Sequence, residues 1–100
     1  MAKKEAKYKI AGVGHLREIL DEQKYTCALT GVPLTPQNTS FDHKRPLSKG
    51  GSSLKENLQA TTKPVNTAKG QLSTEEFLAL CFSVINHAGK SFGYKAIKKS

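Results

Sequence analysis

The 100-residue sequence has no tryptophan, only two cysteines and no long apolar run. Cys27 and Cys81 form no CxxC pair, so they cannot build a disulfide framework or a four-ligand zinc site by themselves. Buried free thiols are the favoured interpretation, and a Cys27–Cys81 bridge is the alternative. No stretch approaches the ~20 apolar residues that span a bilayer, and no apolar segment follows the charged N-terminus as in a secretory signal. We therefore expect one small, soluble, intracellular (cytoplasmic) domain covering residues 1–100.

Acidic residues are also scarce: eight Asp and Glu face sixteen Lys and Arg, which gives a net charge of +8. Residues 1–10 hold four lysines and one acid, and residues 90–100 hold four lysines and no acid. The middle of the chain is nearly neutral. Basic tails of this kind favour a polyanionic partner, above all nucleic acid, whose phosphates they would hold without regard to sequence. The alternative is that the tails only keep a small protein soluble.

Three segments have the pattern of helices. Apolar residues recur at helical spacing over residues 12–23. A second, short helix begins at Lys63 or Pro64, where Thr62 could cap it, and ends at Gly70. The clearest helix is the last, because residues 73–76 form a capping box before a broad apolar face, and Gly89 follows as a stop.

Two short runs rich in strand formers, residues 25–30 and 40–43, predict strands. Residues 48–53 form a Ser/Gly-rich loop, and residues 54–60 are expected to be irregular. The predicted fold class is α+β. The predicted order is strand, loop, strand, loop and short helix, with the N-terminal helix and the C-terminal helix packed against this core.

Polar residues with useful chemistry gather between the second predicted strand and the short helix. Asp42 and His43 end the strand, Asn57 follows in the next segment, and Asn66 and Lys69 share one face of the helix. Phosphodiester hydrolysis needs a base to deprotonate water and a cation to neutralise phosphate charge. A neutral histidine suits the first task and oxygen ligands on a hard cation suit the second. Neighbouring strand residues point to opposite sides, so Asp42 and His43 need a local twist to share a site.

These residues occur in four segments that together resemble the HNH endonuclease family, the ββα-metal nucleases. The resemblance covers roughly residues 25–70, a little under half of the chain. An Asp-His pair, a Gly-Gly loop, an Asn-Leu-Gln and an Asn-x-x-Lys-Gly occur in the family's order and spacing. The segments are CALTG at 27–31, FDHKRPLSKGG at 41–51, ENLQA at 56–60 and VNTAKG at 65–70.

The resemblance implies a function and a role for each residue. It implies a DNA endonuclease in which His43 is the general base and Asn57 holds the loop and orients His43. Asp42 and Asn66 would bind one divalent cation that bridges the scissile phosphate and the departing 3′ oxygen. The short helix would enter the minor groove of duplex DNA, and the products would carry 5′-phosphate and 3′-hydroxyl ends.

The sequence departs from the family pattern at two places. The third signature position, often histidine, is Asn66 here, so the chain is an H-N-N variant; an amide oxygen favours Mg²⁺ or Mn²⁺ over metals that prefer imidazole. Many relatives also build a structural zinc knuckle from two CxxC pairs, of which this chain keeps only Cys27, with other residues at the remaining places: Thr30, Thr62 and Val65. No structural zinc is therefore expected, and the hairpin must be held by packing of Tyr25, Leu29, Leu34, Phe41 and Leu58.

Each site residue also has a purely structural interpretation. Asp42 could be a turn residue, Asn57 a cap, and Lys69 either a phosphate contact or a favourable charge at a helix C-terminus. Further phosphate contacts are expected from Lys44, Arg45, Lys49, Lys55 and Lys63, although each could be solvated surface.

Two other functions compete with a nuclease. One is a basic nucleic-acid-binding protein that keeps the HNH scaffold without catalysis, and the other is a small RNA-associated protein. No base-reading module is visible, so we expect little or no sequence specificity on DNA. The oligomeric state stays open, and a phage or mobile-element origin would suit so compact a nuclease.

Overall fold

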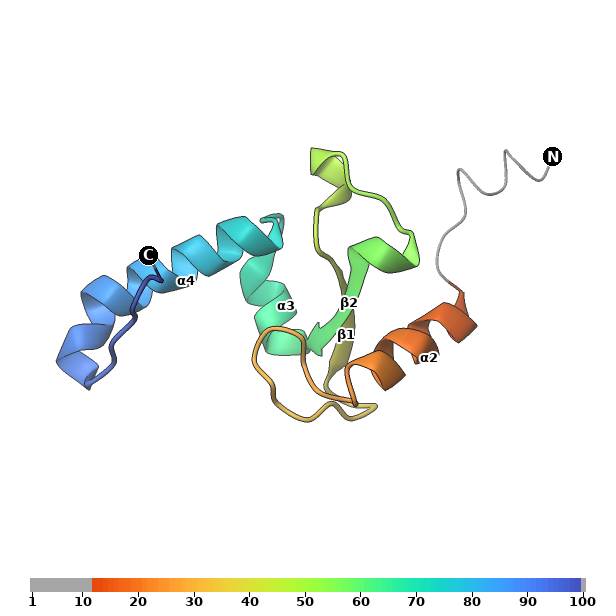
Figure 1. Ribbon diagram of the computed structural model, residues 1–100, viewed down its shortest axis with the longest axis horizontal. Helices are drawn as coiled ribbons and strands as arrows, with labels where there is room; N and C mark the ends of the chain where they lie inside the picture. Colours follow the sequence, from red (N-terminus) through yellow and green to blue (C-terminus); the bar gives the residue numbers. More distant parts are fainter. Residues whose placement is uncertain (1–11, 100) are drawn as a thin grey trace.

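The computed structural model describes residues 12–99, and the basic tail at residues 1–10 lies outside this range. The described chain is a mixed helix-and-strand, α+β protein with one two-stranded antiparallel sheet and three α-helices (Figure 1). The α-helices are α2 (Val13–Glu22), α3 (Lys63–Lys69) and α4 (Thr74–His87); the strands are β1 (Thr39–His43) and β2 (Leu58–Thr62). Three short 3-10 helices complete the fold: η1 (Leu47–Lys49), η2 (Lys55–Asn57) and η3 (Ala88–Phe92).

The sheet pairs β1 with β2, which differs from the predicted pair of strands. Phe41 lies opposite Ala60, Asp42 opposite Gln59, and His43 opposite Leu58. The strand expected at residues 25–30 is wrong: Lys24 and Tyr25 have φ of 54° and 55°, so the extended backbone is broken. The chain turns around residues 27–31, with one isolated bridge from Thr26 to Pro33. The strand-forming residues of this segment do not by themselves determine its conformation, because strand propensity depends on packing against neighbouring residues.

Strand β2 was missed because it has no alternation of apolar and polar residues. All five of its residues are buried. Helices α2 and α3 both contact β2, and Figure 1 shows the strands between these two helices. A strand covered on both faces carries no alternating pattern, which is the usual signal for a strand. Of its polar side chains, Gln59 donates to Asp42 and to the Thr74 hydroxyl, whereas the buried Thr61 hydroxyl has no hydrogen-bond partner among the described residues.

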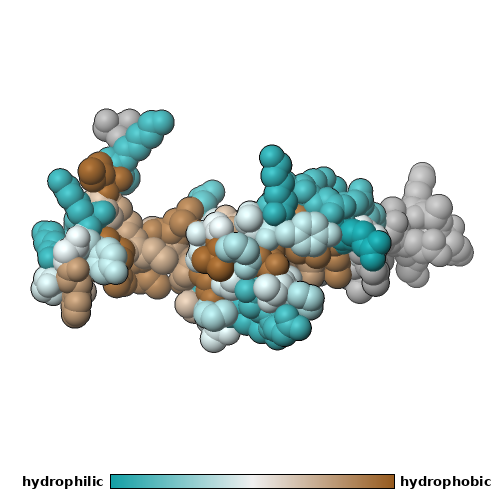
Figure 2. All heavy atoms as spheres, turned by 90° about the horizontal axis from the view of Figure 1, so that it is seen from below, coloured by the Kyte–Doolittle hydropathy of each residue, from teal (hydrophilic) through white to brown (hydrophobic). Residues whose placement is uncertain are grey.

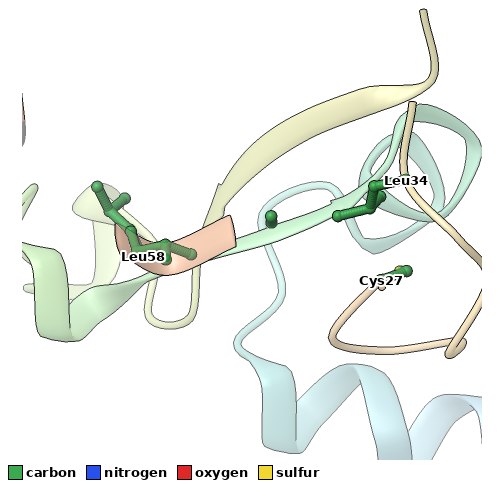
Figure 3. Close-up of a cluster of buried hydrophobic side chains, with 5 residues drawn as sticks. Cys27, Leu34 and Leu58 are labelled. Atoms are coloured by element: carbon green, nitrogen blue, oxygen red, sulfur yellow. The ribbon is translucent and has the colours of Figure 1, made fainter. Parts of the chain in front are cut away.

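The apolar core lies where α2, the 27–34 turn and β2 meet. Its buried residues are Ile19, Cys27, Leu34, Leu58 and Ala60. Figure 3 shows Leu58 at one end of β2, and Cys27 and Leu34 near the other. Leu29 and Phe41 pack against this cluster as predicted, but Tyr25 is 48% exposed and is not a core residue.

Helix α4 begins with the predicted capping box. The Ser73 hydroxyl accepts from the Glu76 amide, and the Glu76 carboxylate accepts from the Ser73 amide. Its first turn is tied to the body: the Thr74 amide donates to the Lys44 carbonyl at 2.9 Å, and Phe77 is buried. The helix ends at His87, and Gly89 lies inside η3 instead of stopping α4.

Beyond its first turn, α4 extends away from the sheet (Figure 1). Leu78, Leu80 and Val84 are about half exposed, and Figure 2 shows brown, apolar surface along this side of the molecule. The expected packing of the C-terminal helix against the core is therefore wrong past Phe77. Helices α2 and α3 make most of the helix contacts with the sheet, and α4 packs mainly against η3, which follows it in the chain.

Candidate functional site

Three of the predicted site residues line one cleft. Asp42 and His43 at the end of β1 and Asn66 in α3 border a cleft of about 320 Å³. His43 is the last residue of β1, where the chain leaves the pleat and turns into the following loop. This position lets two neighbouring residues reach the same cleft, although neighbours within a regular strand point apart. Asp42 and His43 thus border one cleft, while both Asp42 carboxylate oxygens accept hydrogen bonds from Gln59 and Lys69.

The side chain of His43 is half-buried and held by the loop that follows β1. Its Nε2 atom lies 3.0 Å from the Ser53 hydroxyl oxygen, within hydrogen-bond distance. Either ring tautomer is compatible with this contact, because a hydroxyl both donates and accepts. The contact engages one ring nitrogen, Nε2, and fixes the orientation of the ring.

Asn57 closes the loop that carries Ser53. Its Oδ1 accepts from the Arg45 amide at 3.0 Å, and its Nδ2 donates to the carbonyls of Arg45 at 2.9 Å and Ser52 at 2.6 Å. Only glycine fits at position 51, next to this amide, because the Cβ of any other residue would lie 1.8 Å from the Arg45 carbonyl oxygen. The amide therefore joins the two ends of the loop and holds Ser53 near His43.

Asp42 is buried, at 5% exposure, and both of its carboxylate oxygens have partners. Oδ2 accepts from Gln59 Nε2 at 2.9 Å, and Oδ1 accepts from Lys69 Nζ at 3.1 Å. The Lys69 ammonium also donates to the His43 carbonyl at 2.9 Å. Lys69 was expected among the residues that contact phosphate, but its side chain is buried, with 1% of the residue exposed. In this structure its charge is paired with Asp42 instead. The sequence could not show this, because one lysine on a short helix does not reveal whether its side chain faces solvent or the protein interior.

Asn66 is oriented by a neighbour on β1. Its Nδ2 donates to the Ser40 hydroxyl at 2.6 Å, and among residues 12–99 no hydrogen bond reaches its Oδ1. Asp42 and Asn66 both line the cleft, and a carboxylate with an amide oxygen is a donor set that suits a hard divalent cation completed by water, although both Asp42 oxygens already have protein partners. No cluster of three acidic, histidine or cysteine side chains that could hold a metal occurs in the described part of the chain.

The expected phosphate-binding cations differ in their surroundings. Lys44, Arg45 and Lys63 are exposed. Lys49 forms an ion pair with Glu76 at 2.6 Å, and this pairing, with the Ser73 amide, lowers the pKa of Glu76 to about 2. Lys55 pairs with Glu22 at 2.7 Å, and the hydrogen bond to Glu22 raises the pKa of Lys55.

Around Cys27 the structure gathers Thr30 and Thr62, two of the residues that the family resemblance aligned with zinc-knuckle cysteines. The thiol of Cys27 is buried and accepts from the Thr62 amide at 3.4 Å. Burial raises the pKa of Cys27, but hydrogen bonds from the Thr30 hydroxyl and from the backbone amides of Leu29, Thr30 and Thr62 outweigh it and lower the pKa. Cys27 and Cys81 are both free thiols.

Four polar residues of the site were not singled out from the sequence for a site role. Ser40, Ser53 and Thr74 are common surface residue types, and no spacing marks them as partners of Asn66, His43 and Gln59. The fourth, Gln59, stands in the Asn-Leu-Gln segment, which was the one available signal.

Comparison of the chain with protein-family models, with curated proteins and with solved structures finds no match. Within residues 12–99, no helix combines the length and the apolar character that crossing a membrane requires.

Proposed function

We propose that this chain is a divalent-metal-dependent endonuclease of the HNH type that cuts or nicks duplex DNA with little sequence preference. The observation that carries the proposal is the shared cleft, which is lined by Asp42 and His43 from β1 and by Asn66 from α3. Each of these groups has a task in phosphodiester hydrolysis.

The order of elements supports the same proposal. Strand β1, the loop of residues 44–57, strand β2 and helix α3 follow one another, and the candidate residues lie on β1 and α3. This succession has the ββα form that the resemblance implies, although only its first strand, β1, was predicted from the sequence pattern, and β2 replaces the strand expected at residues 25–30.

In the proposed reaction, His43 takes a proton from the attacking water. We place the ring proton on Nε2, where Ser53 Oγ accepts it, so Nδ1 keeps the lone pair that receives the water's proton. The water oxygen forms a bond to phosphorus as the bond from phosphorus to the 3′ oxygen breaks, and the 3′ oxygen takes a proton from solvent. The products are a 5′-phosphate and a 3′-hydroxyl.

The loop residues act on this reaction through His43. Asn57 holds the loop, and Ser53 on that loop holds the ring. A cation bound by Asp42 and Asn66 would neutralise charge on the phosphate and on the departing oxygen. Mg²⁺ and Mn²⁺ fit these oxygen donors best.

Affinity for DNA would come from phosphate contacts. Lys44, Arg45 and Lys63 offer exposed charges near the cleft, Lys49 can exchange Glu76 for phosphate, and basic tails add charge at both ends of the chain. Binding of this kind falls steeply with added salt and does not distinguish base sequences.

A second function, binding nucleic acid without cutting it, is favoured by one observation. Asp42 is already neutralised by the internal cation of Lys69, so the fold does not depend on a metal at this carboxylate. A supercoiled-plasmid assay in Mg²⁺, in Mn²⁺ and in chelator separates the two functions. The nuclease proposal expects nicked or linear DNA only with metal, with ends that ligase can rejoin, and little action on RNA. A gel shift without conversion in any metal would leave the binding protein instead.

A further inference from the structure

We propose that Lys69 is a built-in counter-cation of Asp42, and that a divalent ion binds the cleft in competition with its ammonium group. The inference rests on the proposed metal site and adds a residue that sets how tightly the site binds metal.

The contact between these residues is internal. The side chains of Lys69 and Asp42 are 0% and 6% exposed, and their charged atoms are 3.1 Å apart. Lys69 closes α3 while Asp42 lies near the end of β1, so the ion pair also joins the helix to the strand. The second contact of the ammonium group, to the His43 carbonyl, ties the same end of β1.

Burial explains why the carboxylate needs this partner. A buried charge that loses its partner is strongly destabilising, because neither water nor an opposite charge replaces it. Gln59 supplies a hydrogen bond to Oδ2 but no charge. Without metal, Lys69 is the one cation that forms an ion pair with Asp42 among the described residues.

The same pair opposes metal binding. With Lys69 in place, the carboxylate and the ammonium group sum to zero charge, so a dication would gain little attraction from Asp42 and would be repelled by the neighbouring ammonium group. Removing the ammonium group leaves a net negative site. Two like charges separated by a few ångströms interact strongly even at the effective dielectric of a protein, so we expect a change of at least about tenfold in metal affinity.

The test measures Mn²⁺ binding by calorimetry and by the loss of the free-ion electron paramagnetic resonance signal. Lys69→Met keeps the length of the side chain and removes its charge, whereas Lys63→Met removes an exposed charge from the first residue of the same helix. We expect Lys69→Met to bind Mn²⁺ at least about tenfold more tightly than wild type, and Lys63→Met to match wild type. Equal or weaker binding by Lys69→Met, or an equal gain in Lys63→Met, would overturn the inference.

A second readout covers a Lys69→Met protein that fails to fold without metal. Metal that binds only the folded state then restores it, so Mn²⁺ is expected to return the circular dichroism spectrum and a cooperative melting transition. The double variant Asp42→Asn/Lys69→Met has neither charge and is expected to lose the response to Mn²⁺. No rescue of Lys69→Met, or an unchanged response in the double variant, would place the metal elsewhere and refute the competition.

The plasmid assay separates this inference from the proposed function. If Lys69→Met binds Mn²⁺ more tightly but no variant cleaves DNA, the role of Lys69 as counter-cation is supported and the nuclease function is rejected. If wild type cleaves DNA with metal but Lys69→Met binds Mn²⁺ with unchanged affinity, the nuclease function is supported and the role of Lys69 as counter-cation is rejected. If neither protein binds Mn²⁺, the competition is wrong, and the cleavage result alone judges the nuclease.

Discussion

Helices α3 and α4 differ in both their sequence signals and their roles. Helix α4 has fourteen residues and a complete capping box, yet Leu78, Leu80 and Val84 beyond its first turn are about half exposed. Helix α3 has seven residues, and within the described structure the Thr62 side chain makes no capping hydrogen bond. It nevertheless supplies Asn66 to the cleft and buries Lys69.

The comparison shows that local signals locate a helix but do not say what it contributes. A helix of seven residues is not stable alone in water, so α3 depends on its packing against the sheet. Its polar residues are therefore held in place by tertiary contacts, which suits a site that needs fixed geometry. Helix α4 has the stronger local signals, but none of its residues lines the cleft.

The largest expected effect comes from breaking the ion pair that joins α3 to the sheet. Asp42→Ala leaves the Lys69 ammonium buried without a partner, and we expect a loss of about 4 kcal/mol in the free energy of unfolding. Urea denaturation of the metal-free protein measures it. Replacing both charges, in Asp42→Leu/Lys69→Met, should recover most of this loss; a double variant as unstable as Asp42→Ala would show that charge burial is not the cause.

A smaller effect is expected where α4 meets the body. Phe77→Ala removes a buried ring and should lower the free energy of unfolding by about 3 kcal/mol. Leu80→Ala, one turn further along and half exposed, should cost less than about 1 kcal/mol. Thermal melts of both variants test this, and equal losses would mean that the outer part of α4 is packed after all.

The smallest effect concerns the surface pair of Lys49 with Glu76. Because the pKa of Glu76 in the folded protein is about 2, against an ordinary value of 4.5, its charge stabilises the fold above about pH 4.5. This contribution is lost as the pH falls from there toward 2. The difference in melting temperature between wild type and Glu76→Gln should therefore be constant near neutral pH and shrink over that interval. Glu75→Gln, in the same helical turn, is the control; a difference for Glu76→Gln that does not change with pH would contradict the assignment.

Much of the helix pattern could be predicted from the sequence, because caps, glycines and apolar spacing act locally. The bounds of α3 and the start of α4 follow from Pro64, Gly70 and Ser73. The sheet could not be predicted in the same way. The run at 25–30 has strand-forming residues but turns at Lys24 and Tyr25, while β2 is buried on both faces and lacks alternation.

The candidate site, like the fold, could be predicted only in part. The residues of the cleft, Asp42, His43 and Asn66, were predicted because their types and spacing carry chemistry. Their partners were not, since Ser53 and Lys69 acquire their roles only from contacts across ten and twenty-seven residues of sequence. Such contacts depend on tertiary packing, which no local pattern encodes.

The most direct test of the account is the single-turnover rate at which His43→Ala cuts a labelled DNA duplex in Mg²⁺ or Mn²⁺, compared with His87→Ala. His87 lies in the last turn of α4 and serves as a matched control. We predict that His43→Ala loses about 10²–10⁴-fold in rate or more, as is typical when a general base is missing. Duplex affinity of His43→Ala should stay near that of wild type, and the rate of His87→Ala should be unchanged. Cleavage by homogeneous His43→Ala at the wild-type rate would contradict the central claim.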